Sequence, residues 1–203
     1  MKKILYVILH GSVYKHRYDN VMNTWGKNKD VLFYADYNDK NVIKVSDDVS
    51  YNSNEEKHIN IIKLLNDNNN YDYEWFFFCD DDTFVNTTKL ENSLDTFDPN
   101  FVNGSVINSW ASDFSLSYCS GGAGYLINRN LLGKINLKNH KTGWSDVSLG
   151  LSLRESKIES LNSTLFNSQP PEFYNIEISD VKNYISFHYI KTEDKMKIMI
   201  ENI

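Results

Sequence analysis

The sequence is poor in cysteine and has no long apolar run. Cys79 and Cys119 are its two cysteines, which are too few for a disulfide framework and form no CxxC pair or zinc-type cluster. No apolar run approaches the ~20 residues that a helix needs to cross a bilayer, so we expect no membrane span. The apolar start, Ile4 to Leu9, is shorter than the roughly 7 to 15 apolar residues of a signal peptide. We therefore expect a first strand there, and a cytoplasmic protein whose cysteines stay reduced.

Basic side chains are also scarce relative to acidic ones. The chain has 21 Lys and Arg against 27 Asp and Glu, a net charge of -6. The general attraction to phosphates that nucleic-acid binding requires is therefore missing, and an anionic substrate would need a metal ion or a local basic group. With 203 residues, 41% hydrophobic and 24% charged, the chain can bury a real core. We expect a single domain spanning residues 1–203.

Short apolar runs alternate with helical patterns. The predicted strands are Ile4–Leu9, Val31–Ala35, Trp75–Phe78, Phe101–Val106 and Tyr125–Ile127. One predicted helix starts at Ser53, where Ser53 and Glu56 have capping-box spacing and Ile59, Ile62 and Leu65 follow at intervals of three. A second runs from Asn86 to Phe97. This order predicts a layered α/β domain with its ligand site at the carboxyl ends of the strands.

The strongest local signal is an apolar strand that runs directly into Asp80, Asp81 and Asp82. Three adjacent carboxylates repel one another, and a divalent cation such as Mg²⁺ or Mn²⁺ offsets that cost most easily. The alternative is an acidic turn in which Asp82 or Asn86 only caps the next helix.

A glycine cluster follows at Ser120 to Tyr125, with glycine at positions 121, 122 and 124. It matches neither a Walker loop nor the GxGxxG dinucleotide fingerprint, which argues against P-loop NTPases and Rossmann dehydrogenases. Such glycines let the backbone approach a bulky ligand or adopt positive φ. The alternative is a tight turn with no ligand.

Two single residues complete the set of candidates. Asp146 lies near the start of a predicted helix, where a carboxylate ordinarily serves as a cap. His188 lies in an apolar run from Tyr184 to Ile190, where a histidine is ordinarily a hydrogen-bonded core residue. Taken alone, each has a structural interpretation as well as a functional one.

Together these stretches resemble the Fringe-like β1,3-glycosyltransferase family, and most closely its core 1 β1,3-galactosyltransferase branch. The resemblance starts at Arg17 and Asn23–Gly26. It continues through the acidic triplet and Ser120–Tyr125, and ends at Asp146–Gly150 and Phe187–His188. It implies a GT-A-type, Rossmann-like fold whose central mixed, mostly parallel sheet is flanked by helices.

The resemblance also implies roles for individual residues. Asp82 would ligate Mn²⁺, or Mg²⁺ in its place, with Asp80 near the metal or the ribose and His188 as a further ligand. The donor would be a UDP-sugar, held with the help of Asp80, Asp81, Arg17, Gly121 and Gly122. Asp146 would be the catalytic base. The aromatic residues Trp110, Phe114 and Tyr118 could stack on a sugar, although they could equally belong to the core.

The predicted function is a metal-dependent inverting glycosyltransferase. It would move a hexose or N-acetylhexosamine from a UDP-sugar to a hydroxyl of a glycan or glycoprotein, in a β1,3 linkage. Two departures from the family pattern bear on this prediction: Ser145 stands where the family has an acidic residue, and Asn60 stands where a lysine is common, with Lys63 one turn later. These departures motivate a second hypothesis, a non-catalytic nucleotide-sugar or glycan-binding module of the same fold. A third hypothesis is a metal-dependent phosphohydrolase built on the aspartate triplet.

Overall fold

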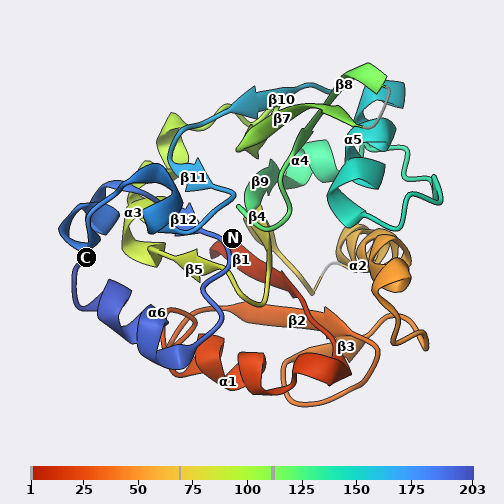
Figure 1. Cartoon of the computed structure of the whole chain (residues 1–203). Coiled ribbons are helices and arrows are strands. Elements are labelled where there is room, and N and C mark those ends of the chain that lie inside the picture. The colour runs from red at the N-terminus through yellow and green to blue at the C-terminus, as the bar shows by residue number, and fades with distance from the viewer. Residues whose placement is uncertain (1, 69, 111–112) are drawn as a thin grey trace.

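A mixed central sheet organises the chain (Figure 1). The computed structural model describes residues 2–68, 70–110 and 113–203. The strands of this sheet are β1 (Lys2–Leu9), β2 (Val31–Ala35), β3 (Val42–Lys44), β4 (Tyr73–Asp80), β6 (Val102–Gly104), β9 (Tyr125–Asn128) and β10 (Ser160–Asn162). Their spatial order is β10-β6-β9-β4-β1-β2-β3. Strand β9 runs antiparallel to both of its neighbours and the other pairs are parallel, so the predicted mixed, mostly parallel sheet is confirmed.

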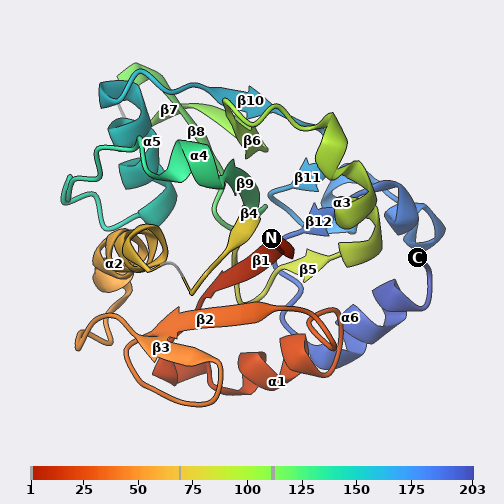
Figure 2. The ribbon, with the colours of Figure 1, turned by 180° about the vertical axis from the view of Figure 1, so that it is seen from behind.

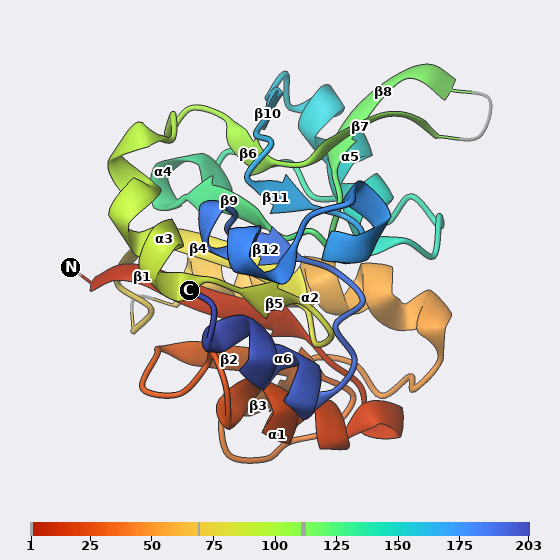
Figure 3. The same ribbon diagram turned by 60° about the vertical axis from the view of Figure 1, so that its left-hand side comes forward.

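A smaller sheet and a hairpin complete the β structure (Figure 3). The smaller sheet contains β5 (Phe84–Val85), β11 (Phe166–Asn167) and β12 (Ser186–Phe187), in the order β11-β12-β5. Strands β7 (Val106–Trp110) and β8 (Asp113–Cys119) pair antiparallel as the hairpin. The smaller sheet brings the C-terminal part of the chain next to the segment that follows β4.

Helices cover both faces of the central sheet, as Figures 1 and 2 show from opposite sides. The α-helices are α1 (His16–Met22), α2 (Asn54–Asp67), α3 (Thr87–Ser93), α4 (Arg129–Leu132), α5 (Ser145–Glu155) and α6 (Glu193–Ile200). Short 3-10 turns occur at η1 (Ser12–Tyr14), η2 (Tyr51–Ser53), η3 (Leu94–Thr96), η4 (Pro171–Tyr174) and η5 (Ile178–Asn183). One core cluster includes side chains of α1, α3 and α6, and the other includes side chains of α2, α4 and α5.

The central strands are apolar on both faces because both faces are covered. Along β4, Phe77 belongs to the first core cluster, and Phe76 and Phe78 belong to the second. Phe76 and Phe77 are fully buried, and each such side chain stabilises the fold by about 1.5–3 kcal/mol relative to an exposed one. This burial fixes the carboxyl end of β4, where the acidic triplet begins.

Two of the predicted elements need correction. Residues 101–106 do not form one strand, because β6 ends at Gly104 and Val106 already belongs to β7. A Cβ at Gly104 would lie 2.9 Å from the Cβ of Tyr125, so this position passes tightly against β9. The predicted helix from Asn86 to Phe97 is α3 followed by η3, and the Asn86 side chain caps it by accepting a hydrogen bond from the Lys89 amide.

The capping box predicted at Ser53 is also wrong. The helix begins at Asn54 after the turn η2, and the Ser53 hydroxyl donates to the carbonyls of Asp48 and Ser50 instead of accepting from the helix. The preceding turn satisfies this hydroxyl locally, so it is not available as a cap. The predicted apolar stripe of this helix is correct, since Ile59, Ile62 and Leu65 are all buried.

Within the described ranges, no helix combines the length and the apolar character needed to span a bilayer.

Candidate active site

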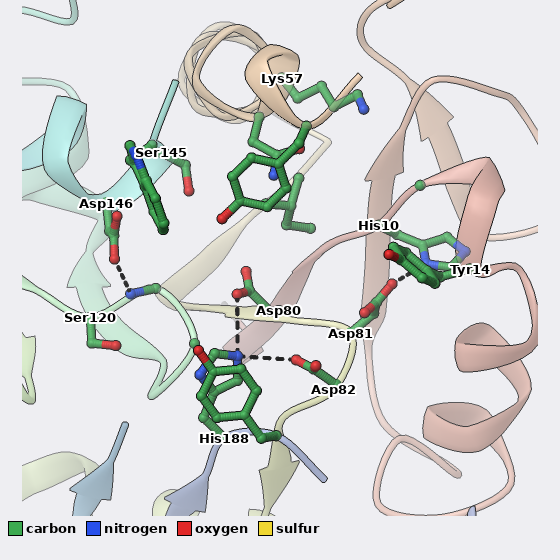
Figure 4. A pocket seen from close by; sticks show the side chains of 18 of the residues that line it. His10, Tyr14, Lys57, Asp80, Asp81, Asp82, Ser120, Ser145, Asp146 and His188 are labelled. Atoms are coloured by element: carbon green, nitrogen blue, oxygen red, sulfur yellow. Dashed lines mark hydrogen bonds and ion pairs between the residues drawn. The ribbon is translucent and has the colours of Figure 1, made fainter. Parts of the chain in front are cut away.

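A cavity of about 540 Å³ lies at the carboxyl ends of β1 and β4, where the alternating pattern predicts a ligand site. Its walls come from the ends of these two strands, the turn η1, the segment around η2, the glycine cluster, the start of α5 and the segment after β12. Figure 4 shows its principal side chains: Asp146 and Ser145 lie on one side of this view, His10 and Tyr14 on the other, and Asp80 between them. Cavities of this size accommodate small-molecule ligands.

Asp80, Asp82 and His188 converge in this cavity. The His188 Nε2 atom lies 3.1 Å from Asp82 Oδ1 and 3.6 Å from Asp80 Oδ2. One ligand atom from each of the three residues lies within 4.8 Å of the other two, so the group could hold a metal ion. The pairing of β12 with β5 causes the convergence, because it aligns Phe187 with Phe84, just after the triplet.

The charges in this group favour a bound cation. Burial, together with the neighbouring carboxylates, raises the pKa of Asp80 to about 7, although His188 opposes this effect. Burial also acts to raise the pKa of Asp82, but the hydrogen bond from His188 and the charge of Arg17 outweigh it, and the net shift is downward. For His188, burial acts to lower the pKa, and the two aspartates turn the net shift upward. A positive charge between the aspartates is therefore stabilised.

Asp81 points away from this group. Its carboxylate accepts from Arg17 Nη1 at 2.8 Å and lies 2.7 Å from His10 Nδ1, while His10 Nε2 lies 2.9 Å from the Tyr37 hydroxyl. Arg17 Nη1 also lies 3.3 Å from Asp82 Oδ2. Asp81 thus fastens the triplet to the segments after β1 and in α1, and no sequence motif indicated His10 as its partner.

The glycine cluster packs against the site's own side chains. The Gly121 amide donates to Asp146 Oδ2 at 3.0 Å, and a Cβ at Gly122 would lie 2.1 Å from the His188 ring. The Gly124 amide donates to the Gly121 carbonyl, so the cluster forms the tight turn that was one of its two interpretations. Because Gly121 and Gly122 also line the cavity, the turn contributes backbone to the site as well.

Asp146 lies in the first turn of α5 and lines the cavity. Its carboxylate accepts from the amides of Gly121 and Val147. Burial raises the pKa of Asp146, and these two hydrogen bonds only partly offset the shift. A carboxylate with a raised pKa is a stronger base than an ordinary surface aspartate.

The lysine that the resemblance implies is absent at position 60, but another lysine of α2 lines the cavity. Asn60 Nδ2 donates to the Val45 carbonyl, which fastens α2 to the segment after β3, and Lys63 is exposed. Lys57, one turn before Asn60, is buried and lines the cavity, and its Nζ lies 3.6 Å from Asp36 Oδ1. A basic group is therefore present in the cavity at a different helix position.

Of the three aromatic residues considered for sugar stacking, Tyr118 lines the cavity. The side chains of Trp110 and Phe114 lie outside the described part of the structure.

The chain was compared with family models and with solved structures, and the structures found are glycosyltransferases. A Fringe-like family model matches residues 10–202. A glycosyltransferase involved in glycosylation of the major capsid of PBCV-1 is similar in structure, with a TM-score of 0.56 and 14% identity over 97% of this chain and 98% of that one. The galactosyltransferase LgtC has a TM-score of 0.55 and 11% identity, over 98% and 96% of the two chains.

GlyE of Streptococcus pneumoniae TIGR4 is also similar, with a TM-score of 0.56 and 16% identity over 94% of this chain and 55% of GlyE. The chain therefore spans about half the length of GlyE. No curated protein matches the chain. At these identities the structural likeness concerns the fold, which is the GT-A type that the family resemblance implied.

Proposed function

Because the chain belongs to the Fringe-like family, we propose that it is a metal-dependent inverting glycosyltransferase with one catalytic domain over residues 1–203. It transfers a hexose or N-acetylhexosamine from a UDP-sugar to a hydroxyl of a glycan or glycoprotein acceptor, in a β1,3 linkage. The observation that carries this proposal is the convergence of Asp80, Asp82 and His188 in the same cavity as Asp146.

Asp80, Asp82 and His188 would hold the metal ion. Two carboxylates and an imidazole suit Mn²⁺ better than Mg²⁺, because Mg²⁺ prefers oxygen ligands alone. The raised pKa of His188 and the lowered pKa of Asp82 are two signs of a site built for positive charge. When bound, the metal would supply Lewis-acid neutralisation of the diphosphate that leaves the sugar.

The donor would occupy the part of the cavity near the ends of β1 and β4. The Arg17 guanidinium lies beside Asp81 and Asp82, and its Nε is buried without a hydrogen-bond partner among the described residues. Because Arg17 also lines the cavity, its guanidinium would offer positive charge to the diphosphate. Asp81 would act mainly by positioning Arg17, since its two oxygens are already engaged, and Gly121 and Gly122 would contribute backbone beside the donor sugar.

Asp146 would act as the general base. Its carboxylate would accept the proton of the acceptor hydroxyl while that oxygen attacks the anomeric carbon and the bond from this carbon to the diphosphate oxygen breaks. A single displacement inverts the configuration, so an α-linked donor gives a β-linked product. The amides of Gly121 and Val147 would hold the carboxylate in place.

The experiment is a donor panel. The purified protein is incubated with UDP-galactose, UDP-glucose and their N-acetylamino counterparts, with Mn²⁺ or with a chelator, and release of UDP is measured. We expect Mn²⁺-dependent release from at least one donor. An Asp146→Asn variant should lose about 10³-fold in transfer, within the range for removal of a general base, while it still binds UDP. Asp95→Asn, which removes an exposed carboxylate outside the cavity lining, is the matched control.

The same panel separates the competing hypotheses. Binding of UDP without turnover of any donor would favour a non-catalytic binding module. Hydrolysis of simple phosphate esters without a sugar donor would favour a phosphohydrolase; among the described residues, however, one metal-type group is found, whereas many such enzymes use two metal ions. Failure to bind UDP at all would overturn the proposal.

We also propose a cytoplasmic location, because Cys79 and Cys119 are both unpaired thiols.

A further inference from the structure

Tyr189 has a backbone conformation that tyrosine rarely adopts. It follows His188 directly, and its φ is +60°, in the left-handed region where a bulky side chain is uncommon and strained. The residue is 44% exposed and lines the cavity. A strained conformation persists only where the surrounding structure enforces it, so its cause lies in the contacts on both sides of Tyr189.

The backbone is anchored before and after Tyr189. Before it, the His188 amide donates to the Asn167 carbonyl at 3.1 Å, and after it, the Ile190 amide donates to the Asp82 carbonyl at 2.8 Å. The Ile190 side chain is buried in the first core cluster. These contacts lead the chain from β12 past the acidic triplet and back into the core, so the residue between them has to turn sharply.

This turn places the Tyr189 ring on the His188 ring. The two ring centroids lie 3.7 Å apart with the ring planes at 22°, a stacked arrangement. In an extended segment, neighbouring side chains point to opposite faces, so two consecutive rings do not stack there. The left-handed conformation of Tyr189 therefore makes the contact possible.

The glycine cluster covers the other face of the His188 imidazole. A Cβ added at Gly122 would lie 2.1–2.4 Å from three atoms of this ring, Nδ1, Cε1 and Nε2. A point that close to all three atoms lies over the face of the ring. The Tyr189 ring cannot occupy the same space, so the two contacts are on opposite faces and the imidazole is held between Gly122 and Tyr189.

These two contacts control where the imidazole points. With both faces covered, the ring cannot tilt, and its Nε2 stays directed at Asp82 Oδ1 and Asp80 Oδ2, at 3.1 and 3.6 Å (Figure 4). A histidine binds a metal ion well only when its ring is correctly oriented. Loss of an outer contact that orients a ligating histidine typically weakens metal binding about 10- to 100-fold.

We propose that Tyr189 is a positioning residue for the metal site: its stacked ring holds His188 in the orientation that ligates the ion. This inference rests on the proposed function and adds a residue that acts through His188. The contact is made by the ring and not by the hydroxyl, so phenylalanine would serve as well. Glycine at position 189 would adopt the same φ without strain but would carry no ring.

The test measures binding of Mn²⁺ alone to the full chain, without a donor, from the EPR signal of the free ion. Tyr189→Ala should raise the Kd for Mn²⁺ about tenfold, whereas Tyr189→Phe keeps the ring and should stay within about threefold of the wild type. Pulsed EPR at saturating Mn²⁺ should show strong modulation from a coordinated imidazole nitrogen in the wild type and Tyr189→Phe. The modulation should be weak in Tyr189→Ala.

A further variant, Tyr189→Gly, separates positioning from stability. It removes the ring and also relieves the strained φ, so it should weaken Mn²⁺ binding as much as Tyr189→Ala but have a higher urea midpoint than Tyr189→Ala. The matched control is Lys157→Gly, because Lys157 is exposed, lies outside the cavity lining and has a φ of +57°. This control should raise the urea midpoint and leave the Kd for Mn²⁺ unchanged.

Three outcomes would overturn the inference. The first is an unchanged Kd for Mn²⁺ in both Tyr189→Ala and Tyr189→Gly, which would leave the proposed metal site and function standing. The second is a loss of Mn²⁺ binding in Tyr189→Phe as large as in Tyr189→Ala, which would assign the effect to the hydroxyl. The third is a wild type that binds no Mn²⁺, in which case the proposed metal site fails together with the role of Tyr189.

Discussion

Two histidines, the buried His58 and the partly buried His188, lie in different electrostatic environments. His58 lies inside the layer between α2 and the sheet, with its ring nitrogens 2.8 Å from the Tyr34 hydroxyl and 2.7 Å from the Tyr125 hydroxyl. His188 lies in the cavity between Asp80 and Asp82. Burial lowers the pKa of His58 to about 3, whereas the aspartates raise the pKa of His188. The fold keeps the His58 imidazole neutral, whereas the two aspartates favour positive charge at His188.

The comparison teaches that burial alone does not identify a functional histidine. A neutral imidazole has one donor and one acceptor nitrogen, so one tyrosine donates to His58 and the other accepts from it, and its hydrogen bonding is complete. His188 has carboxylates as partners, and these can also bind a metal ion. The chemistry of the hydrogen-bond partners separates this structural histidine from the candidate ligand.

The largest expected effect concerns His188, the histidine in the cavity. His188→Ala should lower kcat/KM with the active donor by at least about 10³-fold, or ~4 kcal/mol, because it removes one of three proposed metal ligands. The free energy of unfolding should change by less than about 1 kcal/mol, since Asp82 loses one partner but keeps the Arg17 guanidinium. Kinetics and a Mn²⁺ titration measure the first effect and urea unfolding measures the second. The control is His16→Ala, which removes an exposed histidine. Mn²⁺-dependent turnover that survives in His188→Ala would contradict the proposal that His188 is a metal ligand.

The second prediction concerns the interior histidine. His58→Ala should lower the free energy of unfolding by about 3 kcal/mol, because it leaves a cavity and removes the hydrogen-bond partner of two buried hydroxyls. Activity per folded molecule should stay within about twofold of the wild type. Urea denaturation at pH 7 measures the stability. A stable but inactive His58→Ala protein would reverse the comparison and place this residue in the function.

The third prediction is a pH dependence of stability. The folded protein keeps His58 neutral down to a pKa of about 3, whereas an unfolded histidine binds a proton near pH 6.5. The unfolded state therefore takes up more protons below pH 6.5, and the contribution of His58 to stability is lost as the pH falls. Between pH 6.5 and 5 the loss should be about 2 kcal/mol. Urea midpoints of the wild type and His58→Gln at both pH values isolate this contribution; an identical pH slope in the two proteins would show that His58 does not titrate as described.

The smallest expected effect refines the interior network. Tyr34→Phe removes one of the two hydroxyl partners of His58 and should cost about 1 kcal/mol. Tyr37→Phe offers a comparison at the cavity, because the Tyr37 hydroxyl contacts His10. It should affect donor kinetics more than unfolding. If Tyr34→Phe and Tyr37→Phe had equal effects on donor kinetics and on the free energy of unfolding, the interior and the cavity would not differ as described.

Much of the sheet was predictable because its strands are buried on both faces. The runs Val31–Ala35 and Trp75–Phe78 stand out as uninterrupted apolar segments, and the structure makes them β2 and the centre of β4. The capping box predicted at Ser53 failed, because the hydroxyl forms its hydrogen bonds within the preceding turn. Local spacing cannot show which of two local partners a hydroxyl takes.

The candidate site divides in the same way. Asp80 to Asp82 are visible as a run, and His188 and Asp146 were found through a family resemblance. His10 was missed because its role depends on the register of β1 against β4, which aligns Leu9 with Asp80. Glu55 holds the loop before α5 through the backbone amides of residues 140–143, and it was missed because its partners lie 85 or more residues away along the chain. Neither the register between two strands nor a long-range carboxylate contact produces a residue spacing that can be recognised in a single sequence.

The pairing of β12 with β5 also has a consequence for biosynthesis. The ribosome completes the acidic triplet and β5 long before it reaches His188, so a growing polypeptide can assemble much of the central sheet while His188 is still untranslated. Translation that stops anywhere before Phe187 yields a protein without the closing strand and without the histidine. The group of Asp80, Asp82 and His188 is thus incomplete until the segment after β12 has been translated.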